Sequence, residues 1–92
     1  MAFKQTVSDV FRVANGRTVF VGPIESGPSY VGSQTCELLV DGARRQVLEL
    51  EGEMIPDRPH RQGFRSVSTR SKVELSALEL SDHTCILQSL DP

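Results

Sequence analysis

Apolar and polar residues alternate along most of the chain, a pattern that predicts short β-strands rather than helices. Residues 3–13 are expected to form a first strand with one polar interruption. Asn15-Gly16 then predicts a tight hairpin, because these two residues accept the positive φ angles of a type I′ turn. Residues 18–21, rich in β-branched and aromatic side chains, should form the returning strand, which ends where Pro23 marks an edge or a bend.

Two further strands are predicted around a second turn signal, Asp41-Gly42. Residues 35–40 precede this turn with alternating apolar side chains. Residues 44–52 follow it, with leucines alternating with valine and glutamates, and the strand extends toward residue 55. We expect the leucine face of this strand to be buried and the glutamate face to contact water.

Residues 56–72 break the pattern, because they contain two prolines, a glycine, five Lys or Arg residues and a single acid. We expect a long basic loop here, with residues 66–69 adding at most a short extended piece. Connections of more than about 12 residues without secondary structure are usually functional or mobile. The basic loop is therefore the segment of greatest functional interest.

The remainder of the chain is predicted to add extended structure. Residues 73–80 should be extended, with a β-bulge or bend where the apolar alternation shifts, and residues 84–90 should form the last strand. No segment shows a convincing helical period. About six short strands in 92 residues predict one all-β domain, residues 1–92, folded as a small closed six-stranded, mostly antiparallel β-barrel.

One stretch carries a more specific signature. Residues 9–32, DVFRVANGRTVFVGPIESGPSYVG, combine Val-Phe, a Gly-Arg at the hairpin, Val-x-Val-Gly, Ile-Glu-x-Gly and a later Val-Gly. This stretch resembles the start of the β-barrel that follows the GTPase domain in elongation factor Tu and related translation factors, usually called domain 2. The resemblance implies a six-stranded closed barrel. It implies no enzyme, because the GTPase lies in another domain and no GxxxxGK[ST] loop occurs here.

The resemblance also suggests a site. In elongation factor Tu this barrel binds the aminoacylated end of tRNA; Asp9 and Phe11 match the Asp-Val-Phe segment of that pocket, and Glu53 matches the acid of its Glu-Met pair. Ordinary strand-end roles in the barrel are the alternative for these residues. Three positions depart from the family's pattern, where an acid, an arginine and an asparagine are expected: Ser8, Pro56 and Lys72.

Composition limits the classes of function. Ten Lys and Arg residues against twelve Asp and Glu residues give a net charge of -2, so any surface for nucleic acid has to be local. The chain shows neither an apolar run of about 20 residues nor a signal peptide, which predicts a cytoplasmic protein without membrane contact. In a reducing compartment, Cys36 and Cys85 are expected to be reduced and buried; the alternative, a disulfide between them, requires their strands to be neighbours.

Metal and acid–base chemistry find little support in the sequence. The potential zinc ligands lack the paired spacing of closed zinc sites: Cys36, His60, His83 and Cys85. Glu49, Glu51 and Glu53 share one strand face and could line a metal or glycosidase cleft, but a solvated face is the commoner arrangement. The sequence therefore predicts a non-enzymatic protein that needs no metal, cofactor or nucleotide.

The binding hypotheses concern the basic loop and the barrel surface. A barrel of this kind packs against sister domains in translation factors, so contact with a partner protein or a second copy of the chain is the leading hypothesis. Binding of RNA, tRNA or the ribosome is the alternative, because clustered cations bind phosphates and an aromatic ring among them can stack on a base. The candidate residues are Arg58, Arg61, Phe64, Arg65, Arg70 and Lys72.

Overall fold

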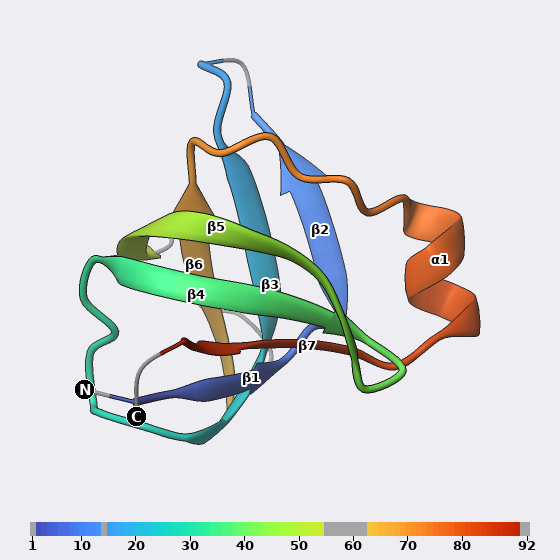
Figure 1. Cartoon of the computed structure of the whole chain (residues 1–92). Coiled ribbons are helices and arrows are strands. Elements are labelled where there is room, and N and C mark those ends of the chain that lie inside the picture. Colours follow the sequence, from blue (N-terminus) through green and yellow to red (C-terminus); the bar gives the residue numbers. More distant parts are fainter. Residues whose placement is uncertain (1, 14, 55–62, 91–92) are drawn as a thin grey trace.

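The computed structural model describes residues 2–13, 15–54 and 63–90 and shows an all-β chain with one short helix (Figure 1). The helix, α1 (Ala77–Asp82), precedes the last strand. The strands are β1 (Lys4–Thr6), β2 (Asp9–Arg12), β3 (Thr18–Ser26), β4 (Gln34–Val40), β5 (Ala43–Met54), β6 (Phe64–Thr69) and β7 (Cys85–Ser89).

The strands form one sheet that closes on itself. Their order is β1-β7-β4-β5-β6-β3-β2, and an additional pairing between β1 and β3 closes a barrel of six strands. The pairings among the described residues are all antiparallel. The predicted fold class is confirmed, with β2 as one strand more than predicted, paired with β3 outside the closed barrel.

The first predicted strand, residues 3–13, is wrong as a single element. β1 pairs with both β7 and β3, whereas β2 pairs with β3 alone, so the chain changes neighbours between them, where Ser8 N donates to Val21 O at 2.7 Å. This crossing requires a glycine in β3. A Cβ atom on Gly22 would lie 1.8 Å from the backbone oxygen of Thr6. Gly22 therefore permits the close backbone contact at which the barrel closes.

β3 continues beyond its predicted end. Pro23 pairs with Phe64 of β6, and β3 runs on to Ser26. On the other side of β3, the pairing with β2 reaches Val21 and the pairing with β1 resumes at Ile24, so Pro23 lies in the gap between these two partners. A strand can accommodate a residue without an N–H group where its ladder is interrupted.

The prediction of a loop over residues 56–72 is wrong for β6, which lies between β5 and β3 in the barrel wall. Val67 is fully buried, but its neighbours in β6 are small hydroxyl residues that look like loop residues in the sequence. Their hydroxyl groups are used in the barrel: Thr69 Oγ1 donates to Glu49 O at 2.5 Å, and Ser68 Oγ donates to Glu51 Oε1 at 3.3 Å. Residues 55–62, with Arg58, His60 and Arg61, lie outside the described residues.

The extended structure predicted for residues 73–80 is wrong from Ala77 onward; residues 73–76 alternate between buried and exposed positions but form no strand. The chain enters helix α1 with a capping box, in which Ser76 Oγ accepts from Glu79 N at 3.1 Å and the Glu79 carboxylate accepts from Ser76 N at 3.5 Å. The apolar alternation changes at the position where helix α1 begins, so the change marks a helix and not a β-bulge. Within the described residues, no helix is both long and apolar enough to cross a membrane.

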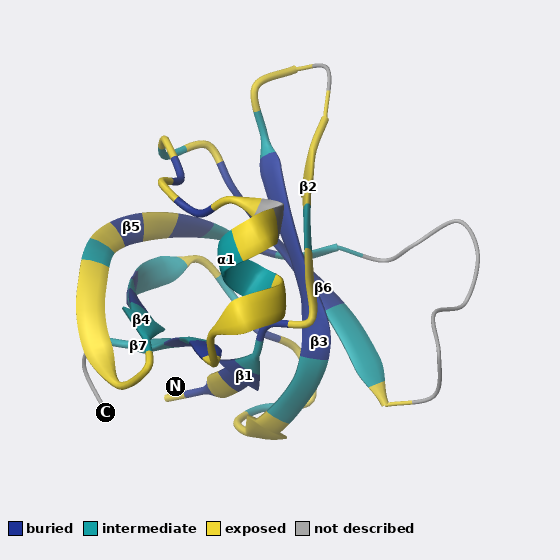
Figure 2. Cartoon of the chain, turned by 90° about the vertical axis from the view of Figure 1, so that its right-hand side faces the viewer, coloured by how far each residue is buried: buried dark blue, intermediate teal, exposed yellow. Residues whose placement is uncertain are grey.

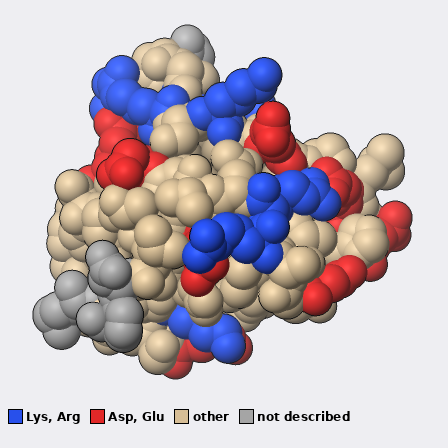
Figure 3. Space-filling view, viewed as in Figure 1, with Lys and Arg blue, Asp and Glu red and all other residues tan. Residues whose placement is uncertain are grey.

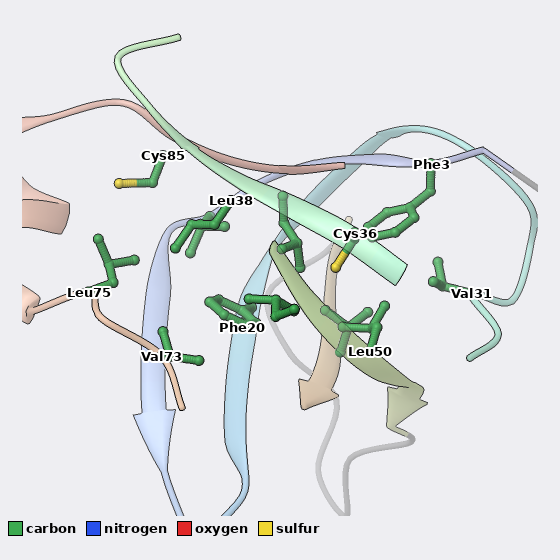
Figure 4. Packing of buried hydrophobic residues seen from close by; sticks show 13 residues of the cluster. Phe3, Phe20, Val31, Cys36, Leu38, Leu50, Val73, Leu75 and Cys85 are labelled. Atoms are coloured by element: carbon green, nitrogen blue, oxygen red, sulfur yellow. The ribbon is translucent and has the colours of Figure 1, made fainter. Parts of the chain in front are cut away.

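The core fills the barrel and extends under the segment before α1 (Figures 2 and 4). As predicted, the leucines of β5 are buried, and so are Cys36 and Cys85, which are both free. β4 and β7 are neighbours, yet Cys36 pairs with Ser89 and Cys85 with Val40. The two cysteines are therefore about 13 Å apart along the strands, too far for a disulfide. Burial raises the pKa of Cys36 to about 12.

Candidate nucleic-acid interface

Arg65, one of the predicted phosphate contacts, forms an ion pair and hydrogen bonds within the fold. Arg65 Nη2 lies 2.5 Å from Glu53 Oε1 and its Nε lies 2.8 Å from Oε2, and Nη2 also donates to the backbone oxygens of Pro28 and Ser29 at 3.2 and 2.9 Å. The side chains of the pair are 26% and 13% exposed. Arg65 therefore ties β6 to β5 and to the β3–β4 loop.

Glu53, a predicted match to the family's pocket, is the acid of this ion pair. The hydrogen bonds from Arg65 hold its pKa below the ordinary value, and a further hydrogen bond from Val31 N at 3.0 Å acts in the same direction. Asp9 and Phe11, the other two matches, lie on β2, and the sheet order places β3 and β6 between β2 and β5. The structure does not bring the three residues together.

Arg70 and Lys72 lie beyond the end of β6, away from Arg65. Two further cations that the sequence interpretation did not include lie beside them. Arg12 at the end of β2 and Arg17 in the β2–β3 hairpin line the same concavity, which has a volume of about 460 Å³. We call this concavity the basic pocket. Lys and Arg side chains gather at the end of the molecule that carries the β2–β3 hairpin, at the top of Figure 3. The remaining lining residues are Val13, Gly16, Thr18, Ser71 and Val73.

The hairpin brings Arg12 and Arg17 together. Arg12 is paired with Thr18 across the β2–β3 ladder, and Val13 N donates to Arg17 O at 2.9 Å to close the turn. Gly16 has a φ of +83°, as predicted, but Asn15 does not have a positive φ, so the hairpin is confirmed and the predicted type I′ turn is wrong. The signal that could have identified these two cations was therefore present in the sequence: two arginines flank a predicted hairpin turn.

The walls of the basic pocket are fixed by backbone contacts. Arg12 Nη2 donates to Val73 O at 2.9 Å and to Leu75 O at 3.1 Å, so backbone oxygens orient its guanidinium, and no carboxylate of the described residues pairs with it. Gln46 Nε2 donates to Lys72 O at 2.8 Å and fixes the backbone there. Among the described residues, the Lys72 ammonium has no hydrogen-bond or ion-pair partner.

Glu51 is the carboxylate that approaches this cluster. Arg17 Nε lies 2.8 Å from its Oε1 and Arg70 Nε lies 2.8 Å from its Oε2. The hydrogen bond from Arg70, followed by that from Arg17, lowers the pKa of Glu51. Each guanidinium has five N–H donors and uses only its Nε here, so both arginines retain donors for a ligand. The acids of β5, expected as a plain solvated face, thus include two that pair with arginines.

Exposed apolar side chains lie on β2, directly after it and on α1, and β2 and α1 pack against each other (Figure 2). Phe11, Val13 and Leu78 are 53%, 41% and 77% exposed. We call these three residues the apolar edge. Phe64, the aromatic of the predicted basic set, is half-buried at the start of β6 and paired with Pro23.

The residues considered as potential zinc ligands are not assembled by the part of the chain that the structure describes. The separation of Cys36 and Cys85 prevents them from sharing one metal ion. No group of three or more His, Cys, Asp or Glu residues among the described residues could hold a metal ion. His83 Nδ1 instead lies 2.5 Å from Asp41 Oδ2 at the surface.

Comparison of the chain with protein-family models, with curated proteins and with solved structures found no match. The resemblance to the translation-factor barrel stays a prediction, as do the cytoplasmic location and the binding hypotheses. The functional argument therefore depends on the residues of the basic pocket and the surface around it.

Proposed function

We propose that the chain is a non-enzymatic binding module whose basic pocket binds the phosphate backbone of RNA. One observation carries this proposal: Arg12, Arg17, Arg70 and Lys72 line one concavity in a chain whose net charge is -2. A net-negative protein gains no general attraction for polyanions, so the binding energy has to come from this local cluster. Cations that neutralise phosphates release condensed counterions, which drives association.

The state of each cation supports phosphate as the ligand. Arg12 is oriented by two backbone oxygens, so no counter-charge has to be displaced before it binds an anion. Arg17 and Arg70 are positioned by Glu51 and present their terminal nitrogens, whose planar geometry matches two phosphate oxygens. Lys72 supplies a point charge. RNA is the polyanion suggested by the resemblance of residues 9–32 to a barrel that binds tRNA.

The proposal is tested by measuring the affinity for a labelled single-stranded RNA over a range of salt concentrations. We expect the logarithm of the affinity to fall linearly with the logarithm of salt, by about 0.7 for each phosphate contact. Lys72→Ala should lower both the affinity and this slope. Arg44→Ala is the matched control, because Arg44 is 55% exposed on the β4–β5 hairpin and pairs with Glu37. Absence of binding at low salt would overturn the proposal.

A second candidate, self-association, is favoured by the apolar edge. β2 pairs with β3 on one side, and its outward side chains include Phe11, 53% exposed. An exposed apolar strand outside the closed barrel is a common protein-contact site. Light scattering after gel filtration should then give a mass above the 10.1 kDa of one chain, which Phe11→Ser reduces. A mass of 10.1 kDa at the highest concentration reached would exclude self-association.

A further inference from the structure

Tyr30 combines an exposed ring with a fixed position. It lies in the β3–β4 loop, the residue is 57% exposed, and its hydroxyl donates to Glu53 O at 3.1 Å. The backbone is fixed on both sides of this residue. Ser29 O accepts from Arg65 at 2.9 Å, and Val31 N donates to the Glu53 carboxylate at 3.0 Å. An exposed aromatic ring that is already oriented loses little conformational entropy when it binds a flat ligand.

Two hollows flank Tyr30. One, of about 210 Å³, is lined by Tyr30 together with Arg17, Glu51 and Glu53, and the other, of about 250 Å³, by Tyr30 with Pro28 and further residues of the same loop. Tyr30 thus borders open space on two sides, where a planar group can approach it.

Arg17 connects Tyr30 to the basic pocket, because it lines both that pocket and the first of the two hollows. β5 also links the basic pocket to Tyr30. Glu51 contacts the arginines of the basic pocket, and Glu53, two residues further along β5, accepts the hydrogen bond from Tyr30. Two residues along a strand span about 7 Å, so one extended ligand can reach both sites.

We propose that Tyr30 is a stacking platform for a base of a single-stranded nucleic acid whose neighbouring phosphates lie in the basic pocket. The inference rests on the proposed function of that pocket. The occupant follows from the charge of the adjacent cations and from the open ring, which together match a chain of phosphates that carries planar bases. Stacking of a base on an aromatic side chain tolerates every base, because each has a π-face.

The composition of the chain supplies a direct probe. Tyr30 is the only tyrosine and the chain has no tryptophan, so tyrosine fluorescence reports on this residue alone. A single-stranded RNA should quench this fluorescence as it binds. An abasic oligonucleotide with the same number of phosphates should bind the basic pocket without the quenching. Free N-acetyltyrosinamide titrated with the same RNA corrects for light absorbed by the bases.

The variants separate stacking from phosphate contact. Tyr30→Ala should weaken RNA binding by about 5- to 150-fold, the range for loss of one stacked base, and leave the salt slope unchanged. Tyr30→Phe keeps the ring and should retain most of the affinity. Lys72→Ala should reduce the salt slope while RNA at saturation still quenches Tyr30. Thermal unfolding of each variant confirms that the comparison is made between folded proteins.

The outcomes distinguish the two proposals. If RNA binds with the expected salt slope but Tyr30→Ala binds equally well, the platform is overturned and the basic pocket stands. Equal quenching by the abasic oligonucleotide would also overturn the platform, because no base is then required. If neither RNA nor the abasic oligonucleotide binds at low salt, both proposals fail. Single-stranded DNA should quench as RNA does, since the stacking uses base faces that the two share.

Discussion

Replacing Arg65 by alanine should destabilise the barrel by about 2–3 kcal/mol, because Arg65 joins three parts of the fold. Its guanidinium donates to both carboxylate oxygens of Glu53 and to two backbone oxygens of the β3–β4 loop. Hydrogen bonds to a charged group contribute about 1.5–3 kcal/mol, and breaking a fully buried ion pair costs about 3–5 kcal/mol. Because the two side chains are 26% and 13% exposed, the pair is not fully buried, and the expected loss lies in the upper part of the first range.

Urea denaturation followed by circular dichroism measures this loss, and Arg44→Ala is the control. Arg44 is 55% exposed and lies 2.9 Å from Glu37, whose side chain is 14% exposed. Glu37 also accepts a hydrogen bond from Gln88 at 2.9 Å, so its carboxylate keeps a partner without Arg44, and the loss should be about 0–1 kcal/mol. A double-mutant cycle with Glu53→Gln isolates the coupling between Arg65 and Glu53, which should exceed that between Arg44 and Glu37.

The result that refutes this reasoning is a loss in Arg65→Ala no larger than that in Arg44→Ala. The ion pair would then be a surface contact, and Arg65 would be available for the phosphate-binding role that its sequence context suggested. The salt dependence of RNA binding separates the two roles. A structural Arg65 makes no phosphate contact, so Arg65→Ala should leave the salt slope unchanged, whereas Lys72→Ala should lower it in the same assay.

Three further predictions follow from the fold. Gly22→Ala should lower the free energy of unfolding, measured by urea denaturation, by about 3 kcal/mol, because a Cβ atom there would lie 1.8 Å from a backbone oxygen. Gly32→Ala is the control and should change stability by less than about 0.5 kcal/mol, because a Cβ atom there has nothing within 4 Å. Equal losses in the two variants would contradict this prediction. The pKa of Glu53 is below its ordinary 4.5 in the folded state, so the ion pair stabilises the fold above pH 4.5 and this stabilisation disappears as the pH falls through the lowered value. Glu53→Gln should therefore flatten the loss of stability in acid, and an unchanged acid limb would contradict the assignment. Cys36, with its pKa raised to about 12 by burial, should react with a thiol reagent only after unfolding, so rapid labelling of the native protein would contradict its placement in the core.

The sequence was sufficient for the barrel but not for several of its elements. The alternation of apolar and polar residues and the two glycine turns are local signals, set by residues adjacent in the sequence, and they identify strands without knowledge of the fold. β6 was predicted only as a short extended piece within a loop, because Ser66, Ser68 and Thr69 are polar, and their burial depends on contacts with β5 and β3 that are distant in the sequence. α1 was missed because six residues are too few to show a helical period, although Ser76 and Glu79 had the spacing of a capping box.

The candidate site was harder to predict because strand pairing, rather than sequence distance, selects its members. The basic loop appeared to be one cluster, yet Arg65 and Arg70 lie at opposite ends of β6 and pair with different acids. The two acids, Glu51 and Glu53, are neighbours on one face of β5, and each fixes a different surface feature. Glu51 positions the arginines of the basic pocket, and Glu53 positions the loop that carries Tyr30. The acidic strand, which in the sequence resembles a face made only for solubility, is therefore the element that sets the distance between the proposed phosphate site and the proposed stacking platform.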